Sequence, residues 1–593
     1  MHARFDDLRE QVAFRFPAPR ETVVARTHEE VPGVLSRVGA RCAAGAWAFG
    51  FLAYEAGAGL DPALPRVDPP PGVPLAWFGL GGPPLAVTPV HAPATYPPTG
   101  PWIPDTDGVR HRRGVLAVQE HIARGETYQA NLTTTLRAAA PADPAAVYAA
   151  MAAEQGGAHH AYLDVGELAI ASASPELFLA LDGDIVRMRP MKGTAERGPT
   201  TATDIAVRDR LLADPKERAE NVMILDLVRN DLGRVAVPGT VSVASLLAAE
   251  RYGTVWQLTS EVTARLHPGT GLPELFAATF PCGSVTGAPK RRSMEILADL
   301  EGAPRGVYCG AIGWLGPGPD GPRGRFSVAI RTMVVDRAAG QATYGVGGGI
   351  TWSSDPTAEH AELLAKARVL GSRTRPAGLL ETFALVEGSP RHLDRHIARL
   401  LDSAAYFDIP ADEGTLRSAV RTALLGRSSA RVRLRLAADG TPELTLAPLP
   451  RDPGPVRLAV DTEPVTSTDV GCHHKTAHRE PYDAARRRHC DADDVVLVNE
   501  RGELVETTVA SLAVRLDGVW YTPPLGAGAL PGVERARQVE SGALLERTLT
   551  PKDLENADAL GVLSSLRGWR PGVLVDGGRG ERHGAERVRD SAR

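Results

Sequence analysis

The chain has 593 residues, of which 43% are hydrophobic and 23% charged, and its formal net charge is -5. This length exceeds what one hydrophobic core supports, so we expect two or three domains. The near-neutral charge, without a basic run interleaved with aromatic residues, argues against a nucleic-acid partner, and no apolar stretch approaches the roughly 20 residues that span a bilayer.

The N-terminus and the cysteines both bear on the location of the protein. Residues 1–20 are charged and lack an apolar signal core. The five cysteines are odd in number and scattered: Cys42, Cys282, Cys309, Cys472 and Cys490. Such usage fits a reducing compartment better than a disulfide framework, so we expect a cytoplasmic protein without a membrane partner.

The first 133 residues predict strands, one helix and one irregular segment. Residues 46–54 form a continuous apolar run of strand length. Residues 61–105 are dense in Pro and Gly and predict an irregular surface segment. Residues 109–123 have helical spacing and end before a glycine, and residues 126–133 resemble the entry to a strand.

A predicted hairpin brings a carboxyl and an amine together. Residues 168–181 are small and apolar, Asp182-Gly183 is a hairpin signal, and residues 184–191 return as a second strand. Folding back across this turn places Lys192 within a few residues of Glu176. A carboxyl and an amine in one cleft shift each other's pKa and can divide acid and nucleophile roles, although a structural ion pair is the alternative.

Lysine is rare in this chain, which makes Lys192 a candidate for chemistry. Only six lysines occur: Lys192, Lys216, Lys290, Lys366, Lys475 and Lys552. Arginine carries surface charge equally well, but it is effectively never deprotonated and is a poor nucleophile. We therefore interpret residues 189–194 as a catalytic centre, with a solvated charge beside a turn as the alternative.

Two helices begin in the same way, with an Asp N-cap followed by Pro at the first helical position. These are Asp214-Pro215 and Asp355-Pro356. Glu217 stands where a capping box places its carboxylate. The second helix is predicted to end at Gly371.

The second of these helices carries a candidate magnesium site. Glu359, Glu362 and Lys366 are spaced i, i+3 and i+7, so they share one helix face. Mg²⁺ prefers a few carboxylates together with water and substrate oxygens, and Glu220 from the other helix would complete such a set. A surface stripe of ion pairs is the alternative.

Glycine-rich segments and one arginine between these helices suit a small anion. Residues 280–290 and 345–350 are interpreted as glycine-rich turns, and Arg331 stands within an apolar strand. Backbone N–H groups and a forked guanidinium both bind carboxylates well. The Gly-Lys-Ser/Thr sequence of a phosphate-binding loop is missing here.

The motifs of residues 110–370 resemble those of the chorismate-utilising enzymes, in the order found in that family. They are Ser174-Pro175-Glu176, Ala219-Glu220-Asn221, Arg229-Asn230-Asp231-Leu232-Gly233-Arg234, Thr286-Gly287-Ala288-Pro289-Lys290 and Ala329-Ile330-Arg331-Thr332. The resemblance implies a two-layer α+β sandwich with the site between large sheets. Lys192 within Pro190–Thr194, and Asn221, resemble the aminodeoxychorismate synthase branch, since anthranilate synthases usually carry Ala and His there.

The resemblance also implies the chemistry of the first site. Lys192 adds to C2 of chorismate while the C4 hydroxyl leaves with Glu176 as general acid, and ammonia then attacks C4. Mg²⁺ binds the ring carboxylate, and its implied ligands are Glu220, Glu362 and, through water, Glu359. The implied substrate-binding residues are Arg331, Tyr308, Thr286, Gly287, Gly347, Gly348, Gly349 and Lys366. No glutaminase triad is visible, so we expect ammonia from a separate glutamine amidotransferase subunit.

Two residues depart from the pattern of this family. Gln257 stands where many relatives have His, and Cys282 replaces a usual Gly or Ala. The first departure concerns contacts that orient the substrate ring.

A second series of predicted strands and helices begins after residue 378. Residues 379–386 alternate like a strand, and residues 392–407 have helical spacing. The Cys and His residues between 472 and 490 match no standard zinc module. Lys475 follows two histidines, and a lysine whose pKa is lowered there can bond to a carbonyl carbon; a surface basic cluster is the alternative.

This second half resembles the class IV pyridoxal-phosphate enzymes over residues 379–570. The motifs are Gly378-Leu379-Leu380-Glu381-Thr382, His396-Ile397-Ala398-Arg399-Leu400, Lys475-Thr476 and Glu506-Thr507-Thr508. The resemblance implies that Lys475 binds pyridoxal 5'-phosphate and carries a proton. The implied cofactor-binding residues are Lys475, Arg399, Glu506, Thr507, Thr508, Gly532 and Val533. Glu534 stands where relatives often have Thr.

Together the two resemblances predict an α+β protein of two enzyme domains. Residues 1–371 form the aminodeoxychorismate synthase-like sandwich, 372–378 a linker, 379–577 an α+β domain like that of class IV, branched-chain aminotransferase-type enzymes, and 578–593 a disordered tail. The implied function is p-aminobenzoate synthesis from chorismate, using Mg²⁺ and pyridoxal phosphate. The alternatives are an anthranilate synthase-like first half, and a second half that is an unrelated aminotransferase or a silent docking module.

Overall fold

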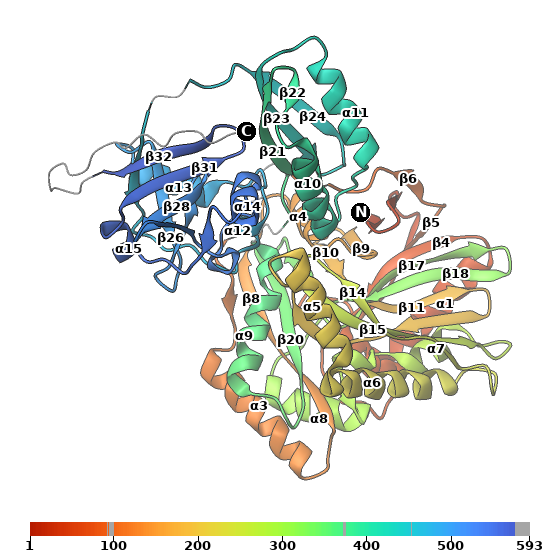
Figure 1. Ribbon diagram of the computed structural model, residues 1–593. Coiled ribbons are helices and arrows are strands. Elements are labelled where there is room, and N and C mark those ends of the chain that lie inside the picture. Colours follow the sequence, from red (N-terminus) through yellow and green to blue (C-terminus); the bar gives the residue numbers. More distant parts are fainter. Residues whose placement is uncertain (92, 94–99, 372–374, 452–453, 576–593) are drawn as a thin grey trace. The chain divides into compact units, whose positions relative to one another are not determined.

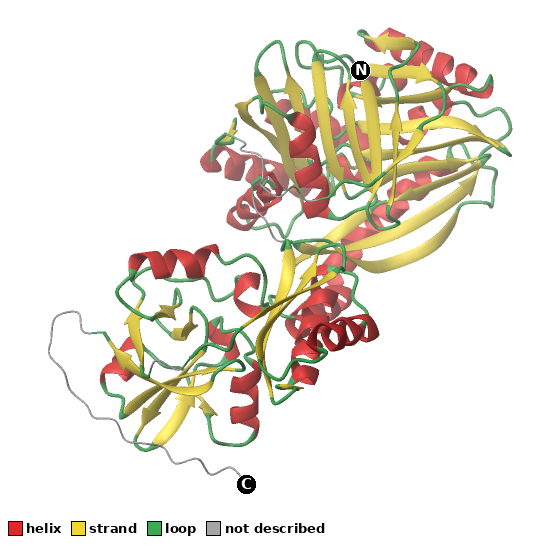
Figure 2. Cartoon of the chain, turned by 90° about the horizontal axis from the view of Figure 1, so that it is seen from above, coloured by secondary structure: helices red, strands yellow, loops and turns green. Residues whose placement is uncertain are grey.

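The computed structural model describes residues 1–91, 93, 100–371, 375–451 and 454–575 (Figure 1). The chain divides into two compact units, Met1–Arg197 with Ala206–Thr374, and Gly198–Ile205 with Arg375–Arg593. Residues 372–374 of the predicted linker and the whole predicted tail lie outside the described residues. Both units mix helices and strands, which confirms the predicted α+β class (Figure 2).

The first unit contains two large sheets. Among the described residues, the first sheet has ten strands, in the order β16 (Gly287–Ala288), β8 (Gln129–Ala139), β20 (Gln341–Ile350), β19 (Thr332–Asp336), β10 (Leu168–Ser174), β9 (His159–Asp164), β1 (His2–Asp7), β2 (Val12–Phe16) and β6 (Leu85–Val87), with β7 (Ile103–Pro104) beside β8. The second also has ten, in the order β13 (Met191–Glu196), β15 (Val255–Arg265), β12 (Ile185–Arg189), β11 (Leu177–Asp182), β18 (Gly321–Val328), β17 (Ala311–Gly318), β4 (Trp47–Leu52), β5 (Ala76–Gly81) and β3 (Glu21–Ala25), with β14 (Ser242–Arg251) beside β15.

Aromatic side chains from both sheets pack against one another. Phe16 stacks on Phe49 with ring centroids 5.2 Å apart, and Phe14 meets Trp314 edge-on at 5.4 Å. Each of these pairs joins a strand of the first sheet to one of the second. The two sheets therefore face each other across an aromatic layer, as expected for a sandwich.

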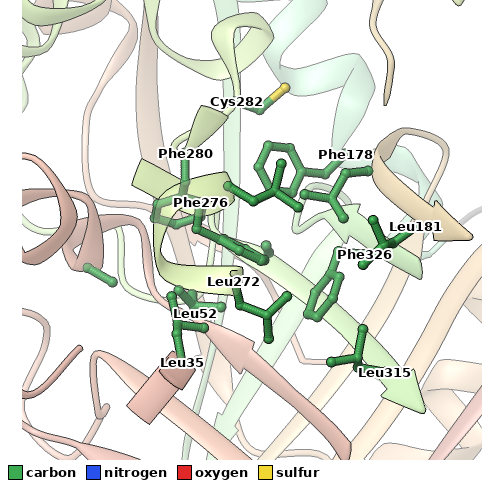
Figure 3. Close-up of a cluster of buried hydrophobic side chains, with 14 of the residues drawn as sticks. Leu35, Leu52, Phe178, Leu181, Leu272, Phe276, Phe280, Cys282, Leu315 and Phe326 are labelled. Atoms are coloured by element: carbon green, nitrogen blue, oxygen red, sulfur yellow. The ribbon is translucent and has the colours of Figure 1, made fainter. Parts of the chain in front are cut away.

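Helices cover the outer faces of the sandwich. A buried cluster on the second sheet combines Phe178 and Phe326 of its strands with Leu35, Leu272 and Phe276 of helices (Figure 3). The helices of this unit are α1 (Val31–Ala43), α2 (Gly57–Leu60), α3 (Gly108–Ala123), α4 (Pro144–Gln155), α6 (Pro215–Gly233), α7 (Leu272–Thr279), α8 (Lys290–Glu301) and α9 (Pro356–Lys366); α5 (Thr201–Ala213) begins in the segment assigned to the second unit.

Most element predictions for this unit are confirmed. The 46–54 run is β4, all of whose residues are buried, and the 109–123 pattern is α3. The hairpin joins β11 and β12, with Asp182 opposite Ile185. Asp214 and Asp355 cap α6 and α9, each accepting two backbone N–H groups.

The predictions for residues 61–105 and for the end of the second capped helix are wrong. Residues 61–105 contain β5, because Trp77, Phe78 and Leu80 form a short apolar run that pairs between β3 and β4. The second capped helix ends at Lys366, before a 3-10 turn over Arg368–Leu370, rather than at Gly371.

The second unit contains a small and a larger sheet. Its four-stranded sheet runs β22 (Ser389–Pro390), β21 (Gly378–Val386), β23 (Ala430–Ala437) and β24 (Pro442–Ala447). The eight strands described for the other sheet run β27 (Leu504–Thr507), β26 (Asp494–Val498), β25 (Val456–Val460), β32 (Gly568–Leu574), β31 (Ala559–Ser564), β28 (Ser511–Leu516), β29 (Val519–Thr522) and β30 (Leu545–Glu546). The helices are α10 (Leu393–Phe407), α11 (Glu413–Leu424), α12 (Val470–His473), α13 (Glu480–Arg488), α14 (Val533–Glu540) and α15 (Pro551–Glu555).

The cysteines add no disulfide to the cores of the two units. All five cysteine thiols are free, and only Cys490 is exposed. Within the described ranges no helix is both long and apolar enough to cross a membrane. The predicted strand at 379–386 is β21 and the predicted helix at 392–407 is α10.

Candidate functional site

Lys192 lies at an irregularity in β13. Met191 pairs with Thr259 and Thr194 pairs with Gln257, so β13 has one more residue than β15 between these two pairs. Such a bulge re-aims a side chain out of the regular pleat. Gly193 makes it possible, since its φ of +96° lies in the region that favours glycine.

The backbone of Lys192 is fixed by Asn221 on α6. The Asn221 amide donates to the carbonyl oxygens of Lys192 and Leu258, at 3.0 Å each. Its own oxygen accepts the Ser260 hydroxyl at 2.6 Å. Asn221 is 1% exposed, so its hydrogen bonds hold Lys192 against β15 without competition from water.

Glu176, just before β11, is 2% exposed and lies in the same cavity as Lys192. Burial raises the pKa of Glu176 to about 7, although a hydrogen bond from Ser284 and the charge of Lys192 oppose this. Burial also lowers the pKa of Lys192. Near neutral pH the Glu176 carboxyl can therefore hold a proton, and burial favours the neutral form of the Lys192 amine.

The raised pKa of Glu176 gives a pH prediction. If Glu176 supplies a proton, turnover of the first site falls as pH rises through about 7, because the acid form is lost there. Glu176→Gln is expected to lower kcat by about 10²-fold to 10⁴-fold and to abolish this descending limb. The pH dependence of kcat for both proteins measures it, and a limb that persists unchanged in Glu176→Gln would contradict the role.

The three acidic side chains predicted to bind Mg²⁺ come from two helices, and all of them line the cavity. They are Glu220 of α6 and Glu359 and Glu362 of α9. Glu362 pairs with Lys366 at 2.9 Å, and Glu359 accepts the Ser354 hydroxyl at 2.7 Å. Burial raises the pKa values of Glu220 and Glu359, whereas Lys366 lowers that of Glu362.

Carboxylate oxygens of this kind are the ligands that Mg²⁺ prefers, so the donor set fits the ion. In this structure the positive charge beside Glu362 comes from Lys366. The Lys366 amine also donates to the Gly347 carbonyl at 2.8 Å. In the part of the chain that is described, no three acidic, histidine or cysteine side chains converge as a metal-binding group. The magnesium site therefore stays a prediction.

Arg331 lines the cavity. It does not lie inside a strand, although its sequence context predicted that it would. It connects β18 and β19 with a φ of +51°, a conformation that non-glycine residues seldom adopt. The Arg331 guanidinium donates a hydrogen bond to the Gln155 amide oxygen at 2.8 Å. An unusual backbone conformation that aims a guanidinium into a cavity is typical of a ligand-binding position.

The segment Gly345–Ile350 is a strand rather than the predicted turn. It belongs to β20 and pairs with β8 along its whole length, with Gly349 opposite Asn131. A Cβ atom at Gly349 would collide with the Lys192 amine and with the Gln129 amide. The glycines therefore let neighbouring side chains approach the sheet closely.

The cavity has a volume of about 180 Å³ and gathers most of the predicted residues of the first unit. These are Glu176, Lys192, Glu220, Tyr308, Arg331, Gly347, Gly349, Glu359, Glu362 and Lys366. Thr286, Gly287 and Gly348 are not among the lining residues. The Thr286 hydroxyl donates to the Cys282 and Gly283 carbonyls, and Gly287 pairs with Ala130.

Several lining residues escaped the sequence argument. They include Asn131, Lys216, Glu217, Ser284, Val285 and Tyr344. Glu217 accepts the Thr194 backbone N–H at 3.2 Å instead of closing a capping box. Gln257, the departure from the family pattern, donates to the Thr194 hydroxyl at 2.7 Å. Lys216 carried a signal in the sequence, because lysine is rare in this chain.

In the second unit, Lys475 follows α12 and is tied to the small sheet. The Lys475 carbonyl accepts the Leu380 N–H at 2.8 Å, and Thr476 bridges to Leu379. Burial, and then the positive charge of Arg399, lower the pKa of Lys475 to about 8. A substantial fraction of this amine is neutral near physiological pH, as a bond to a carbonyl carbon requires.

Glu506 of β27 lies near Lys475. Burial raises the pKa of Glu506 to about 7, although Lys475 and the Tyr482 hydroxyl, which donates to it at 3.2 Å, oppose the shift. Thr507 and Thr508, predicted to bind the cofactor, both donate their hydroxyls to Asp494. These hydroxyls are thereby committed to a protein carboxylate.

Arg399 of α10 and the start of α14 form the other end of this site. Arg399 donates to the Pro531 carbonyl at 2.9 Å, and Gly532 is the N-cap of α14, which begins at Val533. A helix N-terminus and a guanidinium both suit phosphate. An amine, an acid and two phosphate-binding elements fit pyridoxal phosphate in chemical type.

The fold is mixed α+β, and each unit contains one candidate site. The chain belongs to the family described as chorismate binding enzyme, whose model matches residues 11–372. Residues 378–575 match the model described as amino-transferase class IV. Both resemblances found in the sequence are confirmed.

Individual relatives match the first half of the chain. "Anthranilate synthase component 1" of Streptomyces coelicolor is 40% identical over 299 residues, which cover 50% of this chain and 57% of that protein. "Aminodeoxychorismate synthase" of Streptomyces pristinaespiralis is 42% identical over 287 residues, covering 48% and 38%. "Aminodeoxychorismate synthase component 1" of Bacillus subtilis is 37% identical over 255 residues, covering 43% and 53%.

These matches span only part of each relative, between 38% and 57% of its length. Among solved structures, anthranilate synthase component I from Streptococcus pneumoniae TIGR4 has a TM-score of 0.51 at 24% identity. The match covers 63% of this chain and 90% of that one. This structural likeness concerns the fold alone.

Proposed function

We propose that this chain makes p-aminobenzoate from chorismate in two steps, one in each unit. The first unit replaces the C4 hydroxyl of chorismate with an amine, and the second removes pyruvate. The observation that carries the proposal is the presence of Lys192 and Glu176 in one cavity, which Arg331 and the three predicted Mg²⁺ ligands also line.

In the first step, Lys192 and Glu176 divide the roles of nucleophile and acid. The neutral Lys192 amine bonds to ring carbon C2, the two conjugated ring double bonds each shift by one carbon, and the C4–oxygen bond breaks. The Glu176 proton goes to the departing hydroxyl, which leaves as water. Ammonia then bonds to C4, both double bonds shift back, and the Lys192–C2 bond breaks. These roles agree with the raised pKa of Glu176 and the lowered pKa of Lys192.

The remaining groups of the cavity bind the two carboxylates of the substrate. Arg331 and Tyr308 would hold the enolpyruvyl carboxylate, with Lys366 assisting. Glu220, Glu362 and Glu359 would hold Mg²⁺, which supplies a positive charge for the ring carboxylate. Ammonia would come from a separate glutamine amidotransferase subunit.

Removal of divalent cations tests the metal. We expect EDTA to abolish chorismate consumption and added Mg²⁺ to restore it, because the ring carboxylate otherwise meets uncompensated acidic side chains. Glu220→Gln should raise the Mg²⁺ concentration for half-maximal activity by about tenfold or more. Asp226→Asn, on the exposed side of the same helix, is the control and should match the wild type. Full activity in EDTA would contradict the metal role.

In the second step, Lys475 takes the proton from C4 of the aminated ring. The electrons of that bond form a ring double bond, the bond from C3 to the ether oxygen breaks, and the leaving group departs as pyruvate after a proton is added to it. The remaining ring is aromatic. Pyridoxal phosphate, when bound, supplies the electron-withdrawing group that makes the C4 proton acidic. Glu506 and Arg399 would orient its ring and its phosphate.

Product identification separates this function from its alternatives. Incubation of the chain with chorismate, Mg²⁺, ammonium and pyridoxal phosphate should yield p-aminobenzoate and one equivalent of pyruvate. The ortho isomer would indicate an anthranilate synthase, for which relatives of that name are a specific reason. Accumulated aminodeoxychorismate, with transamination of another amino acid, would indicate an aminotransferase. The same accumulation without any cofactor bound would indicate a docking module.

A further inference from the structure

A buried carboxylate that the proposed mechanism does not use lies directly behind Arg399. Glu381 of β21 is 1% exposed. It receives two hydrogen bonds from the Arg399 guanidinium, at 2.8 and 2.7 Å, and one from Nδ1 of His396, at 2.6 Å. Burial alone would raise the pKa of Glu381, but Arg399 and His396 outweigh it and lower that pKa to about 2. An ionised carboxylate only accepts hydrogen bonds, so the His396 Nδ1 carries a proton.

The chain of hydrogen bonds reaches the larger sheet at one end and the segment before α14 at the other. Nε2 of His396 pairs with the Ser565 hydroxyl at 2.7 Å, at the turn between β31 and β32. At the other end, Arg399 donates to the Pro531 carbonyl at 2.9 Å, immediately before α14. Glu381, His396 and Arg399 all belong to the small sheet and its helix α10. The cluster therefore links the two sheets of the second unit beside the start of α14.

The orientation of Arg399 is over-determined by these partners. A guanidinium has five N–H groups, and three of them are used here, two by Glu381 and one by Pro531. Two N–H groups are left for a ligand. Because Glu381 cancels the charge of Arg399, a phosphate there would depend on the direction of those two N–H groups more than on net charge.

We propose that Glu381, His396 and Ser565 are positioning residues that fix the Arg399 guanidinium so that its two remaining N–H groups recognise the phosphate group of pyridoxal phosphate. This inference rests on the proposed function of the second unit. It separates recognition of the phosphate from recognition of the aldehyde, which is the task of Lys475. Loss of a positioning residue should therefore weaken binding of pyridoxal phosphate without affecting pyridoxal, which has the same aldehyde and no phosphate.

The test measures the Kd of each of these two aldehydes for the full chain, with absorbance as the signal of binding. Glu381→Gln is expected to raise the Kd for pyridoxal phosphate by about 10-fold to 100-fold, and Ser565→Ala by about 2-fold to 10-fold. The Kd for pyridoxal should stay unchanged in both variants. Glu443→Gln is the matched control, because Glu443 forms an exposed ion pair with Arg435 in the same sheet and should leave both constants unchanged.

Each outcome decides the question. Equal weakening for both aldehydes, or no weakening, would overturn the positioning role while leaving the proposed function in place. A wild type that binds neither aldehyde would overturn the proposed second step and this inference together. If Glu381→Gln does not fold, Ser565→Ala decides alone, since a loss confined to pyridoxal phosphate supports the proposal and any other result contradicts it.

Discussion

Replacement of Lys192 by alanine is expected to lower the rate of 4-amino-4-deoxychorismate formation by about 10³-fold or more, equivalent to about 4 kcal/mol of lost transition-state stabilisation. The reason is that the variant lacks the amine that bonds to C2, while Glu176 and the acidic side chains remain. Steady-state conversion of chorismate with ammonium as nitrogen source, followed by separation of the product, measures the loss. The second step should be unaffected when aminodeoxychorismate is supplied.

Lys192→Arg distinguishes a nucleophile from a simple positive charge. Arginine keeps the charge near Glu220 but is not deprotonated under these conditions, so it should be as inactive as alanine. Substantial activity in Lys192→Arg would mean that charge alone is needed, and the covalent step would then be wrong. Lys552→Ala, an exposed lysine in the second unit, controls for loss of a lysine as such.

The sequence was sufficient for the elements whose signals are local. Asp-Pro caps, the Asp182-Gly183 turn and the apolar run at β4 depend on residues adjacent in the chain, and each is confirmed. The hairpin then implied the approach of Lys192 to Glu176, because pairing of β11 with β12 leaves few residues between them.

Features that depend on distant partners could not be read in this way. The bulge at Lys192 is defined by the pairing of β13 with β15. Asn221 of α6 holds it through three hydrogen bonds to residues of these two strands. The glycines of β20 resembled a turn because glycine is usual in turns, whereas pairing with β8 over ten residues overrides that preference. A Pro-rich and Gly-rich composition hid β5 for the same reason.

Replacement of Lys475 by alanine is expected to stop pyruvate release, with a loss of about 10³-fold or more, while chorismate is still aminated. The aminated intermediate should therefore accumulate in solution and p-aminobenzoate should not. The visible absorbance that pyridoxal phosphate gains on bonding to a lysine should also be missing. In the wild type, the rate at which this absorbance develops should rise with pH through about 8, because the reacting amine must be neutral and its pKa lies there.

This variant also shows whether the two units work independently. If Lys475→Ala slows the first step as well, product leaving the first site must depend on the second, and the halves are coupled. If the absorbance persists in Lys475→Ala, another of the few lysines binds the cofactor and the assignment of Lys475 fails. Its lowered pKa and the neighbouring Glu506 and Arg399 favour Lys475, since Lys552, the other lysine of the second unit, is exposed on α15 and lacks these partners.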